Sequence, residues 1–492
     1  MIRQFAGRAT PWIVLANLAL VVPLAWILNV WQDEAYSLLT TTGSLAHTVH
    51  QAIFFEQNAP LYFVVLWFWR HVSTGYFWAR ILSIGCIATT IGLVPALIRR
   101  YAPGIPAAAV TLTVAFNPLT VWAAVEIRSY AMAIALGALA MLAGYDAFFA
   151  PASRRYALLA FVAIGAAAAY TQYFILFLIA GFGIVLAAKR SWKPLARYVL
   201  AGVAMLVLFV PELVILPAQL SAFRTAYLGP ASLGQALEQL AKILFFQLFQ
   251  IGELPHRAVF AAAIAAALIV GLVLGRKHFA GRGPRLAIAL LAASAVVYAT
   301  AVYVLKTHLD YRYGAFLFIP LILATFSLLG WWDGAARRRG AIALATLLLC
   351  VSAVVLVHTY RSGAKIGDWR RVGAFLDANA SASQPIVVFQ AENAVPLAYY
   401  YRGPGRIVAI PHPVDFRSYD VARFVIHRSS EVNAAIVRLG NPRELWLVTA
   451  GACHSLNVRY GCGLVNAYFD AHYATVERRD FYHASVRLLR RN

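Results

Sequence analysis

The segment Pro11–Val30 reads PWIVLANLALVVPLAWILNV, contains no charged residue, and is followed after two further residues by the acidic pair Asp33-Glu34. A helix of about 20 residues, rising about 1.5 Å per residue, crosses the apolar core of a bilayer, which is about 30 Å thick. Arg3 and Arg8 precede the segment, so its two flanks differ in charge. Because basic residues stay on the cytoplasmic side of a membrane, we predict a transmembrane helix with a cytoplasmic N-terminus.

The composition of the whole chain excludes a soluble enzyme. Of the 492 residues, 61% are hydrophobic and 13% are charged, whereas soluble proteins contain about 45–50% apolar and about 25% charged residues. The formal net charge is +22, which in a soluble protein would suggest a nucleic-acid partner. Many basic residues cluster in short segments between apolar runs, and no base-reading motif accompanies them. We therefore expect membrane lipids, and no nucleic acid, as partners.

Ten further apolar runs follow the first one. They are Tyr76–Ile98, Ile105–Trp122, Ser129–Phe149, Tyr156–Ala169, Phe174–Ala188, Tyr198–Leu216, Ala258–Gly275, Leu286–Leu305, Tyr313–Trp331 and Ala341–Val357. Basic clusters follow every second run, at residues 99–100, 154–155, 189–190, 276–277 and 337–339. If all of them are cytoplasmic, the chain is a polytopic α-helical protein of the cell inner (plasma) membrane with about eleven crossings and an external C-terminus.

Two stretches fit this scheme less simply. Pro60–Trp69 is apolar and aromatic but too short to span, so we interpret it as a juxtamembrane or re-entrant helix. Tyr156–Ala188 is long enough for one helix, yet the polar group Tyr170-Thr171-Gln172-Tyr173 at its centre favours two helices that turn at the outer face.

The composition changes abruptly after Val357, and the remaining residues are polar, rich in arginine and interrupted by Pro and Gly. We predict a transmembrane domain over residues 1–358 and a periplasmic, extracytoplasmic α/β domain over 359–492, because about 130 residues can bury a core of their own. The expected strands are Pro385–Phe389, Arg406–Ile410 and Glu444–Thr449, and the expected helices are Trp369–Asn379 and Val421–Leu439.

Cys453 and Cys462 lie in one loop of the second domain, in GACHSLNVRYGCG. They are close enough in sequence to form a disulfide in an oxidising compartment. A zinc site built from these two cysteines and His454 is the alternative, although a fourth ligand is missing.

The topology places nine ionisable residues at the outer face. A charge at a membrane edge is costly unless it is paired or functional, so this face is where we expect the chemistry. The residues are Asp33, Glu34, Glu56, Glu126, Arg128, Lys306, His308, Asp310 and Arg312.

Short motifs follow one another through the membrane part in a definite order. They are Asp33-Glu34, Pro60-Leu61-Tyr62, Arg80-x-x-Ser83, Glu126-x-Arg128-x-Tyr130, and Arg312-Tyr313 before an apolar stretch containing Pro320. With Asp368-Trp369-Arg370 after the last span, this succession resembles the GT-C glycosyltransferases, in the bacterial branch related to protein O-mannosyltransferases and to the aminoarabinose transferase of lipid A. The chain departs from that pattern at Gln57–Pro60, where many members have His-Pro-Pro or Glu-Lys-Pro.

The resemblance implies transfer of a sugar from a polyprenyl-phosphate donor to a lipid, glycan or protein acceptor at the outer face, with inversion at the anomeric carbon. Such a reaction needs a carboxylate to take the acceptor proton and cations to hold the departing phosphate. By this resemblance Asp33 is the general base, while Glu34 either orients a hydroxyl or caps a helix. Glu126 matches the second acidic position of the family.

The remaining candidates surround these groups. Arg128 and Arg312 are the expected phosphate ligands, because guanidinium offers bidentate donors, and Lys306 either assists them or extends to the interface. The other candidate substrate-binding residues are Glu56, Tyr62, Arg80, Tyr130, Tyr173, His308, Asp310 and Tyr313.

Cofactor use is open at this point. No cofactor is certain, and a divalent metal ion is an alternative whose candidate ligands would be Glu56, His256, His308 and Asp310, although no ligand spacing connects them.

A lipid or sugar transporter, or flippase, is the rival function. It would favour helices broken by Gly or Pro near mid-membrane and inverted repeats, and neither is evident in the sequence.

Overall fold

The computed structural model describes residues 2–150, 156–226, 229–278, 285–307, 310–455 and 458–492. Contacts divide the chain into two compact units. The first consists of Met1–Trp26, Ala59–Pro217 and Gly229–Thr359, and the second of Ile27–Asn58, Ala218–Leu228 and Tyr360–Asn492. The segment after the first apolar run therefore belongs to the same unit as the C-terminal part of the chain.

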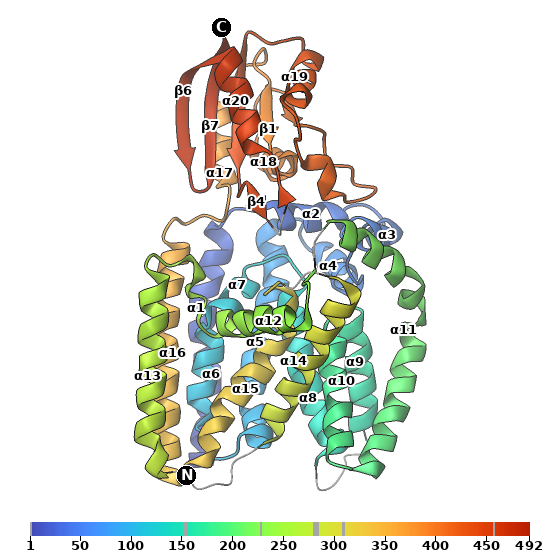
Figure 1. Cartoon of the computed structure of the whole chain (residues 1–492), viewed down its shortest axis with the longest axis vertical. Coiled ribbons are helices and arrows are strands. Elements are labelled where there is room, and N and C mark those ends of the chain that lie inside the picture. Colours follow the sequence, from blue (N-terminus) through green and yellow to red (C-terminus); the bar gives the residue numbers. More distant parts are fainter. Residues whose placement is uncertain (1, 151–155, 227–228, 279–284, 308–309, 456–457) are drawn as a thin grey trace. The chain divides into compact units, whose positions relative to one another are not determined.

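The described residues of the first unit form helices connected by turns and contain no strand of the main sheet (Figure 1). Its helices are α1 (Ile2–Ile27), α4 (Leu61–Arg70), α5 (Tyr76–Tyr101), α6 (Ala107–Phe116), α7 (Pro118–Ala124), α8 (Tyr130–Phe148), α9 (Ala157–Ala169), α10 (Ile175–Ala188), α11 (Trp192–Ala226), α12 (Leu233–Phe249), α13 (Arg257–Gly275), α14 (Leu286–Leu305), α15 (Phe318–Ser327) and α16 (Gly334–Tyr360). The part of α11 after Pro217 belongs to the second unit. Short 3-10 turns, η3 (Tyr313–Leu317) and η4 (Leu328–Trp331), flank α15.

All eleven predicted apolar runs are helical in the structure. Within the described residues, eight segments are long and apolar enough to cross a membrane, and α6 with α7 makes a ninth if the bent pair is one span. α9 and α10 have 13 and 14 residues, fewer than the ~20 that a straight crossing needs. The predicted multi-pass helical architecture is thus confirmed, and Tyr156–Ala188 forms two helices.

The apolar run Ile105–Trp122 forms two helices, α6 and α7, in place of one straight helix. The chain bends by 55° between α6 and α7, at Asn117-Pro118. Proline lacks an N–H group and disfavours a helical residue before it. Asn117 is accordingly extended, and its side chain accepts a hydrogen bond from the N–H of Leu119 at 2.8 Å, which caps α7.

The stretch Pro60–Trp69 forms a short helix, α4, of 10 residues. Its first amide, that of Leu61, donates to the carbonyl of Tyr170 at 2.8 Å, so α4 begins beside the turn between α9 and α10.

α12 is a helix that hydropathy alone does not reveal. It lies crosswise to the long helices (Figure 1), and Ser232 caps it by accepting the N–H of Gln235 at 3.1 Å. Its buried residues Ala236, Leu240, Ile243 and Gln247 recur at helical spacing along one face. Such an amphipathic helix has too many polar residues to register as a span.

Of the five basic clusters, residues 154–155 lie outside the described part of the chain, and the other four gather at one end of the helical unit. Arg100 at the end of α5 makes two hydrogen bonds, of 2.8 and 2.7 Å, to Asp146 at the end of α8. The ammonium of Lys189, after α10, lies 5.3 Å from the ring centre of Phe149 after α8. These contacts place the ends of α5, α8 and α10 together.

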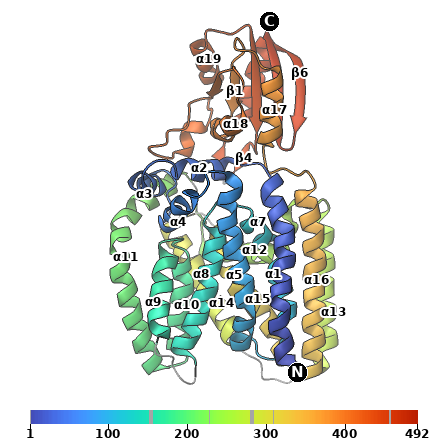
Figure 2. The same cartoon turned by 180° about the vertical axis from the view of Figure 1, so that it is seen from behind.

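The segments after α13 and before α16 lie at the same end. His278 bonds Asp333 at 2.8 Å, and a Cβ atom on Gly104, just after α5, would come within 2.7 Å of the Arg337 guanidinium. Figures 1 and 2 show that this is the end at which the N-terminus lies.

The second unit contains every strand that the structure describes. Its main sheet has the order β2-β1-β3-β7-β6, in which β1, β2 and β3 are parallel and β7 and β6 antiparallel. The strands are β1 (Ile386–Phe389), β2 (Ile407–Ala409), β3 (Glu444–Ala450), β6 (Tyr473–Phe481) and β7 (Ala484–Arg491), with a small β4 (His454–Ser455) and β5 (Val458–Arg459) ladder apart from them. The three predicted strands and the α/β character are confirmed.

Two apolar cores cover the two faces of this sheet. α17 (Trp369–Asn379) and α18 (Ala394–Tyr400) pack against one face, and α19 (Ser429–Arg438) and α20 (Cys462–His472) pack against the other. All four residues of β1 are buried, as expected for a central parallel strand.

The predicted helix over Val421–Leu439 is partly wrong. The chain forms the 3-10 turn η6 (Val421–Phe424), then an extended stretch, and only then α19. The extended stretch forms because the Ile426 N–H donates to the carbonyl of Tyr460 at 3.0 Å, which a helix would prevent.

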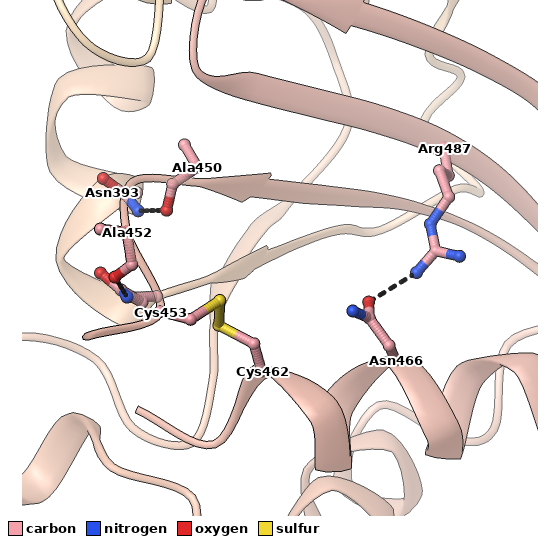
Figure 3. Close-up of a disulfide and its surroundings, with 8 residues drawn as sticks. Asn393, Ala450, Ala452, Cys453, Cys462, Asn466 and Arg487 are labelled. Carbon is pink, nitrogen blue, oxygen red and sulfur yellow. Dashed lines mark hydrogen bonds between the residues drawn. A yellow bond between two sulfur atoms is a disulfide. The ribbon is translucent and has the colours of Figure 1, made fainter. Parts of the chain in front are cut away.

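Cys453 and Cys462 form a disulfide, with Cα atoms 5.8 Å apart. The bond joins the segment after β3 to the start of α20 (Figure 3). Near the disulfide, the side-chain amide of Asn393 donates to the carbonyl of Ala450, the last residue of β3, at 3.0 Å (Figure 3).

The collected basic clusters generate a prediction about topology. We expect the end of the helical unit that carries them to be cytoplasmic and residues 360–492 to be outside, because the positive-inside rule fixes orientation. Reporter fusions after Arg339 and at Asn492 should therefore fall on opposite sides of the membrane. Fusions on the same side would overturn the scheme.

Candidate active site

The acidic pair of the first loop lies at the start of α2 (Gln32–Thr40), in the second unit. Trp31 before the helix is extended, and the Glu34 carboxylate accepts its backbone N–H at 3.4 Å. Acidic residues in a first turn also favour the helix dipole. Glu34 is fully buried whereas Asp33 is half-buried, so Asp33 is the more accessible of the two carboxylates.

Glu34 is also paired with a cation. Its carboxylate lies 3.0 Å from the ammonium of Lys365, whose side chain is only 9% exposed. The backbone N–H of Lys365 donates to Asn29 at 2.7 Å, just before α2. This cap and ion pair favour the capping role that the sequence left open for Glu34.

A second buried carboxylate, Glu392, binds the same helix. One of its oxygens accepts hydrogen bonds from Gln32 at 2.5 Å, from Tyr36 at 3.3 Å and from Tyr419 at 2.8 Å. Glu392 is 1% exposed. Burial, with a smaller contribution from the negative charge of Asp33, raises the pKa of Glu392 to about 7, although the hydrogen bonds oppose the shift.

Glu56 follows α3 (Leu45–Phe54) and is half-buried. Its carboxylate accepts the hydroxyl of Thr40, at the end of α2, at 3.2 Å. The neighbouring Gln57 donates to the carbonyl of Tyr419 at 3.1 Å. Glu56 therefore belongs to the same loop structure as Asp33.

The remaining predicted groups lie in the first unit, and two of the sequence motifs touch there. The Ser83 hydroxyl donates to the backbone carbonyl of Glu126 at 2.6 Å. Arg80 is fully buried, donates to the carbonyl of Ala25 at 2.7 Å, and lies 5.0 Å from the ring centre of Tyr76. Arg80 thus joins α5 to the end of α1, which is a structural task.

Glu126 and Arg128 lie between α7 and α8. Glu126 is 1% exposed. The Arg128 guanidinium lies 5.9 Å from the ring centre of Phe63 on α4, a cation–π arrangement. The adjacent Tyr62 is buried. The Pro-Leu-Tyr and Glu-x-Arg-x-Tyr motifs are therefore neighbours.

A row of aromatic rings connects this group to the segment after α14. Tyr130 stacks on Trp122 with ring centres 5.0 Å apart, and Trp122 lies 5.7 Å from Tyr311. Next to Tyr311, Asp310 accepts the Nε of Arg312 at 3.0 Å and its backbone N–H at 2.8 Å. Asp310 thereby orients the Arg312 guanidinium.

Tyr313 and Tyr173 are both neighbours of Phe174, Tyr313 in space and Tyr173 in sequence. Tyr313 stacks on Phe174 with ring centres 5.2 Å apart. The Tyr173 hydroxyl donates at 2.8 Å to Glu212, a buried carboxylate of α11. The structure therefore gathers Glu126, Arg128, Tyr130, Arg312 and Tyr313 at one end of the first unit.

Lys306 caps α14 and is exposed, with its ammonium 4.2 Å from the ring centre of Tyr303 on its own helix. His308 lies outside the described residues. Among the residues that are described, no three His, Cys, Asp or Glu side chains converge as around a metal ion.

Residues of the Asp368-Trp369-Arg370 motif have structural contacts within the second unit. Trp369 is buried in the core beneath α17, and Asp368 is 2% exposed and ion-paired to Arg371 at 3.0 Å. Burial raises the pKa of the Asp368 carboxyl, which Arg371 opposes.

Sequence reasoning missed Lys365, Glu392 and Glu212. Glu392 lies three residues after the end of the apolar strand β1, and a charged residue soon after a buried strand is a usable signal. No sequence pattern around Lys365 or Glu212 indicates a role for them, because the partner of each lies far away in the sequence.

No protein-family model matches the chain, and no curated protein matches it significantly. Among solved structures, the chain is similar to ArnT from Cupriavidus metallidurans. The apo structure has a TM-score of 0.54 at 15% identity, and the structure bound to undecaprenyl phosphate has a TM-score of 0.52 at 13% identity. Both comparisons cover 98% of each chain. The chain therefore has a GT-C fold, as its ordered motifs predict.

The Glu34–Lys365 pair predicts a thermal-stability pattern. Lys365→Met should lower the unfolding midpoint, because removing one partner of a buried ion pair costs about 3–5 kcal/mol. Adding Glu34→Gln removes the stranded charge and should recover part of the loss. Scanning fluorimetry of detergent-purified protein measures all three proteins.

Arg478→Met is the matched control, since its pair with Asp480 is 60% and 59% exposed and such pairs contribute about 0–1 kcal/mol. A Lys365→Met protein as stable as this control would contradict the assignment of a buried pair.

Proposed function

We propose that the protein is an integral-membrane glycosyltransferase that moves a sugar from a polyprenyl-phosphate donor to a lipid, glycan or protein acceptor at the extracytoplasmic face. The observation that carries this proposal is the fold likeness to ArnT, which extends over 98% of both chains and includes a structure with bound undecaprenyl phosphate. Residues 1–358 supply most of the proposed catalytic groups, and residues 359–492 form the proposed periplasmic domain.

Asp33 is the proposed general base. The acceptor hydroxyl oxygen bonds to the anomeric carbon as the bond from that carbon to the phosphate oxygen breaks, which inverts the configuration. The acceptor proton passes to the Asp33 carboxylate, and the polyprenyl phosphate leaves. The partial exposure of Asp33 on α2 supports this role better than the enclosed position of Glu34.

Arg128 and Arg312 are the proposed phosphate ligands. Negative charge grows on the phosphate as the glycosidic bond breaks, and guanidinium stabilises it through bidentate hydrogen bonds. The ring of Phe63 and the carboxylate of Asp310 hold the two guanidinium groups. Lys306 is a further cation near the same segment.

Sugar contacts are assigned to the groups beside these cations. Glu126 and Tyr130 lie next to Arg128, Tyr62 lies beside Phe63, and Tyr313 follows Arg312. A nucleotide sugar is a poor candidate donor because it is cytoplasmic, whereas these groups lie at the end away from the basic clusters. The sequence also has no nucleotide-binding glycine loop.

Two variants should fail differently in a purified system. Asp33→Asn removes the basic lone pair, so turnover should fall by roughly 10²–10⁴-fold while undecaprenyl phosphate still binds. Arg312→Ala removes hydrogen bonds to the phosphate, so binding and turnover should weaken together. Native mass spectrometry measures undecaprenyl phosphate binding. Turnover is measured with mannosyl- or aminoarabinosyl-phosphoundecaprenol against UDP- and GDP-sugars, with membranes of a deletion strain as acceptor.

Asp377→Asn is the control for Asp33→Asn, because Asp377 is exposed and accepts the backbone N–H groups of residues 402 and 403. Turnover of a nucleotide sugar alone would refute the proposed donor. An Asp33→Asn enzyme near the wild-type rate would transfer the base assignment to Glu34 or Glu126.

A further inference from the structure

Glu392 lies on a rigid part of the second unit. It is the middle residue of η5 (Ala391–Asn393), which directly follows Gln390 at the end of β1. Two side chains near Glu392 hold this turn to the end of β3 and the residues after it. Gln390 donates to the carbonyl of Ala452 at 2.8 Å. Asn393 donates to the carbonyl of Ala450 at 3.0 Å (Figure 3). The position of the Glu392 carboxylate is therefore fixed relative to the main sheet.

The contacts of Glu392 with α2 bracket Asp33. Gln32, which bonds Glu392 at 2.5 Å, immediately precedes Asp33. Tyr36, which bonds it at 3.3 Å, follows Asp33 by one helical turn. Two attachments on the same helix, one before and one after Asp33, restrict both the position and the rotation of that turn.

Tyr36 and Tyr419 extend this attachment. Tyr419 donates to the same Glu392 oxygen at 2.8 Å, and the Tyr36 ring lies 5.1 Å from Phe55 and 6.4 Å from Tyr419. Burial and the nearby Glu392 charge raise the pKa of Tyr36 well above its ordinary value, so its hydroxyl stays a donor.

The Glu34–Lys365 ion pair also holds the turn that carries Asp33. The other bonds between residues 27–58 and the C-terminal segment hold positions outside that turn. The Val30 N–H donates to Tyr400 at 2.7 Å, and Asn29 accepts from Lys365. Gln57 bonds Tyr419 at the far end of the loop. The Glu392 bonds differ from these three in that they attach side chains on both sides of Asp33.

We propose that Glu392 is a positioning residue that fixes α2, and through it Asp33, to the C-terminal domain. This inference rests on the proposed function, in which Asp33 is the general base. It makes the C-terminal domain part of the catalytic machinery, because a carboxylate of that domain sets the direction from which the base meets the acceptor hydroxyl.

The arrangement gives a pH dependence with a defined sign. The titratable groups that face Glu392 are Asp33 and Tyr36 on α2 and Tyr419 before η6, and Glu56 acts on Tyr36. Because the pKa of Glu392 is raised to about 7, its carboxyl gains a proton as the pH falls below that value. The protonated group is a weaker acceptor, so the hold on α2 and the turnover number kcat should both decline.

Glu392→Gln tests the proposal, because glutamine keeps the shape but not the charge. We expect kcat to fall about 10–100-fold, since a misplacement of about 1 Å can cost about 10²-fold in rate, with the donor KM unchanged. The decline of kcat below pH 7 should disappear. Hydrogen–deuterium exchange of the amides of residues 32–40 should be faster than in the wild type. Tyr419→Phe removes one donor and should cause a smaller change of the same kind.

Asp377→Asn is the matched control, a carboxylate-to-amide change in the same domain at a side chain that bonds the backbone of residues 402 and 403. It should leave kcat and the exchange of residues 32–40 at wild-type values. Hydrogen–deuterium exchange at the wild-type rate in Glu392→Gln would overturn the proposal. A loss of activity in which kcat still declines below pH 7 would overturn it as well. A wild-type enzyme that turns over no lipid-linked donor would instead refute the proposed function, while the exchange measurement still decides whether Glu392 holds α2.

Discussion

The cost of placing charge in the apolar core of a bilayer is the constraint on which the arrangement depends. It confines the arginines and lysines of the connecting segments to one end of the helical unit, where Arg100, Lys189 and Arg337 are in contact with neighbouring helix ends. The opposite end carries Glu126, Arg128 and Arg312, and it is the end at which we propose that the lipid phosphate binds.

The first loop is subject to a second constraint, the cost of burying a carboxylate. Its acidic residues belong to the same compact unit as the C-terminal segment. Glu34 is neutralised by Lys365 at 3.0 Å, and Gln32 and Tyr36 are bound by Glu392. Buried carboxylates are costly unless they are paired or hydrogen-bonded, so these contacts define one conformation of α2. Because Asp33 lies on the same helix, these contacts also determine its position.

Sequence patterns predict those parts of the fold that depend on local composition. The apolar runs become helices, β1 is a buried apolar strand, and α17 has its predicted bounds of Trp369–Asn379. The bend at Asn117-Pro118 is hidden inside a continuous apolar run, and α12 is amphipathic. β6 is an exposed edge strand whose residues 478 and 479 are both arginine, so it lacks the alternation that predicts a strand.

The candidate site is predictable only in part for the same reason. Ordered short motifs single out Asp33, Glu126, Arg128 and Arg312 as candidates, whereas Glu392 bonds a residue 360 positions away. No local pattern encodes such a pairing, because it follows from how residues 27–58 fold onto the C-terminal sheet.

Mass spectrometry of envelope glycolipids and glycoproteins, in a deletion strain complemented with wild-type or Asp33→Asn protein, tests the central claim most directly. It detects a change in any envelope sugar, whichever sugar and acceptor the enzyme uses. The account predicts that one sugar-bearing species disappears on deletion, returns with the wild type, and stays absent with an Asp33→Asn protein that is present in the membrane at normal amounts. An unchanged set of envelope sugars on deletion, or full restoration by Asp33→Asn, would contradict it.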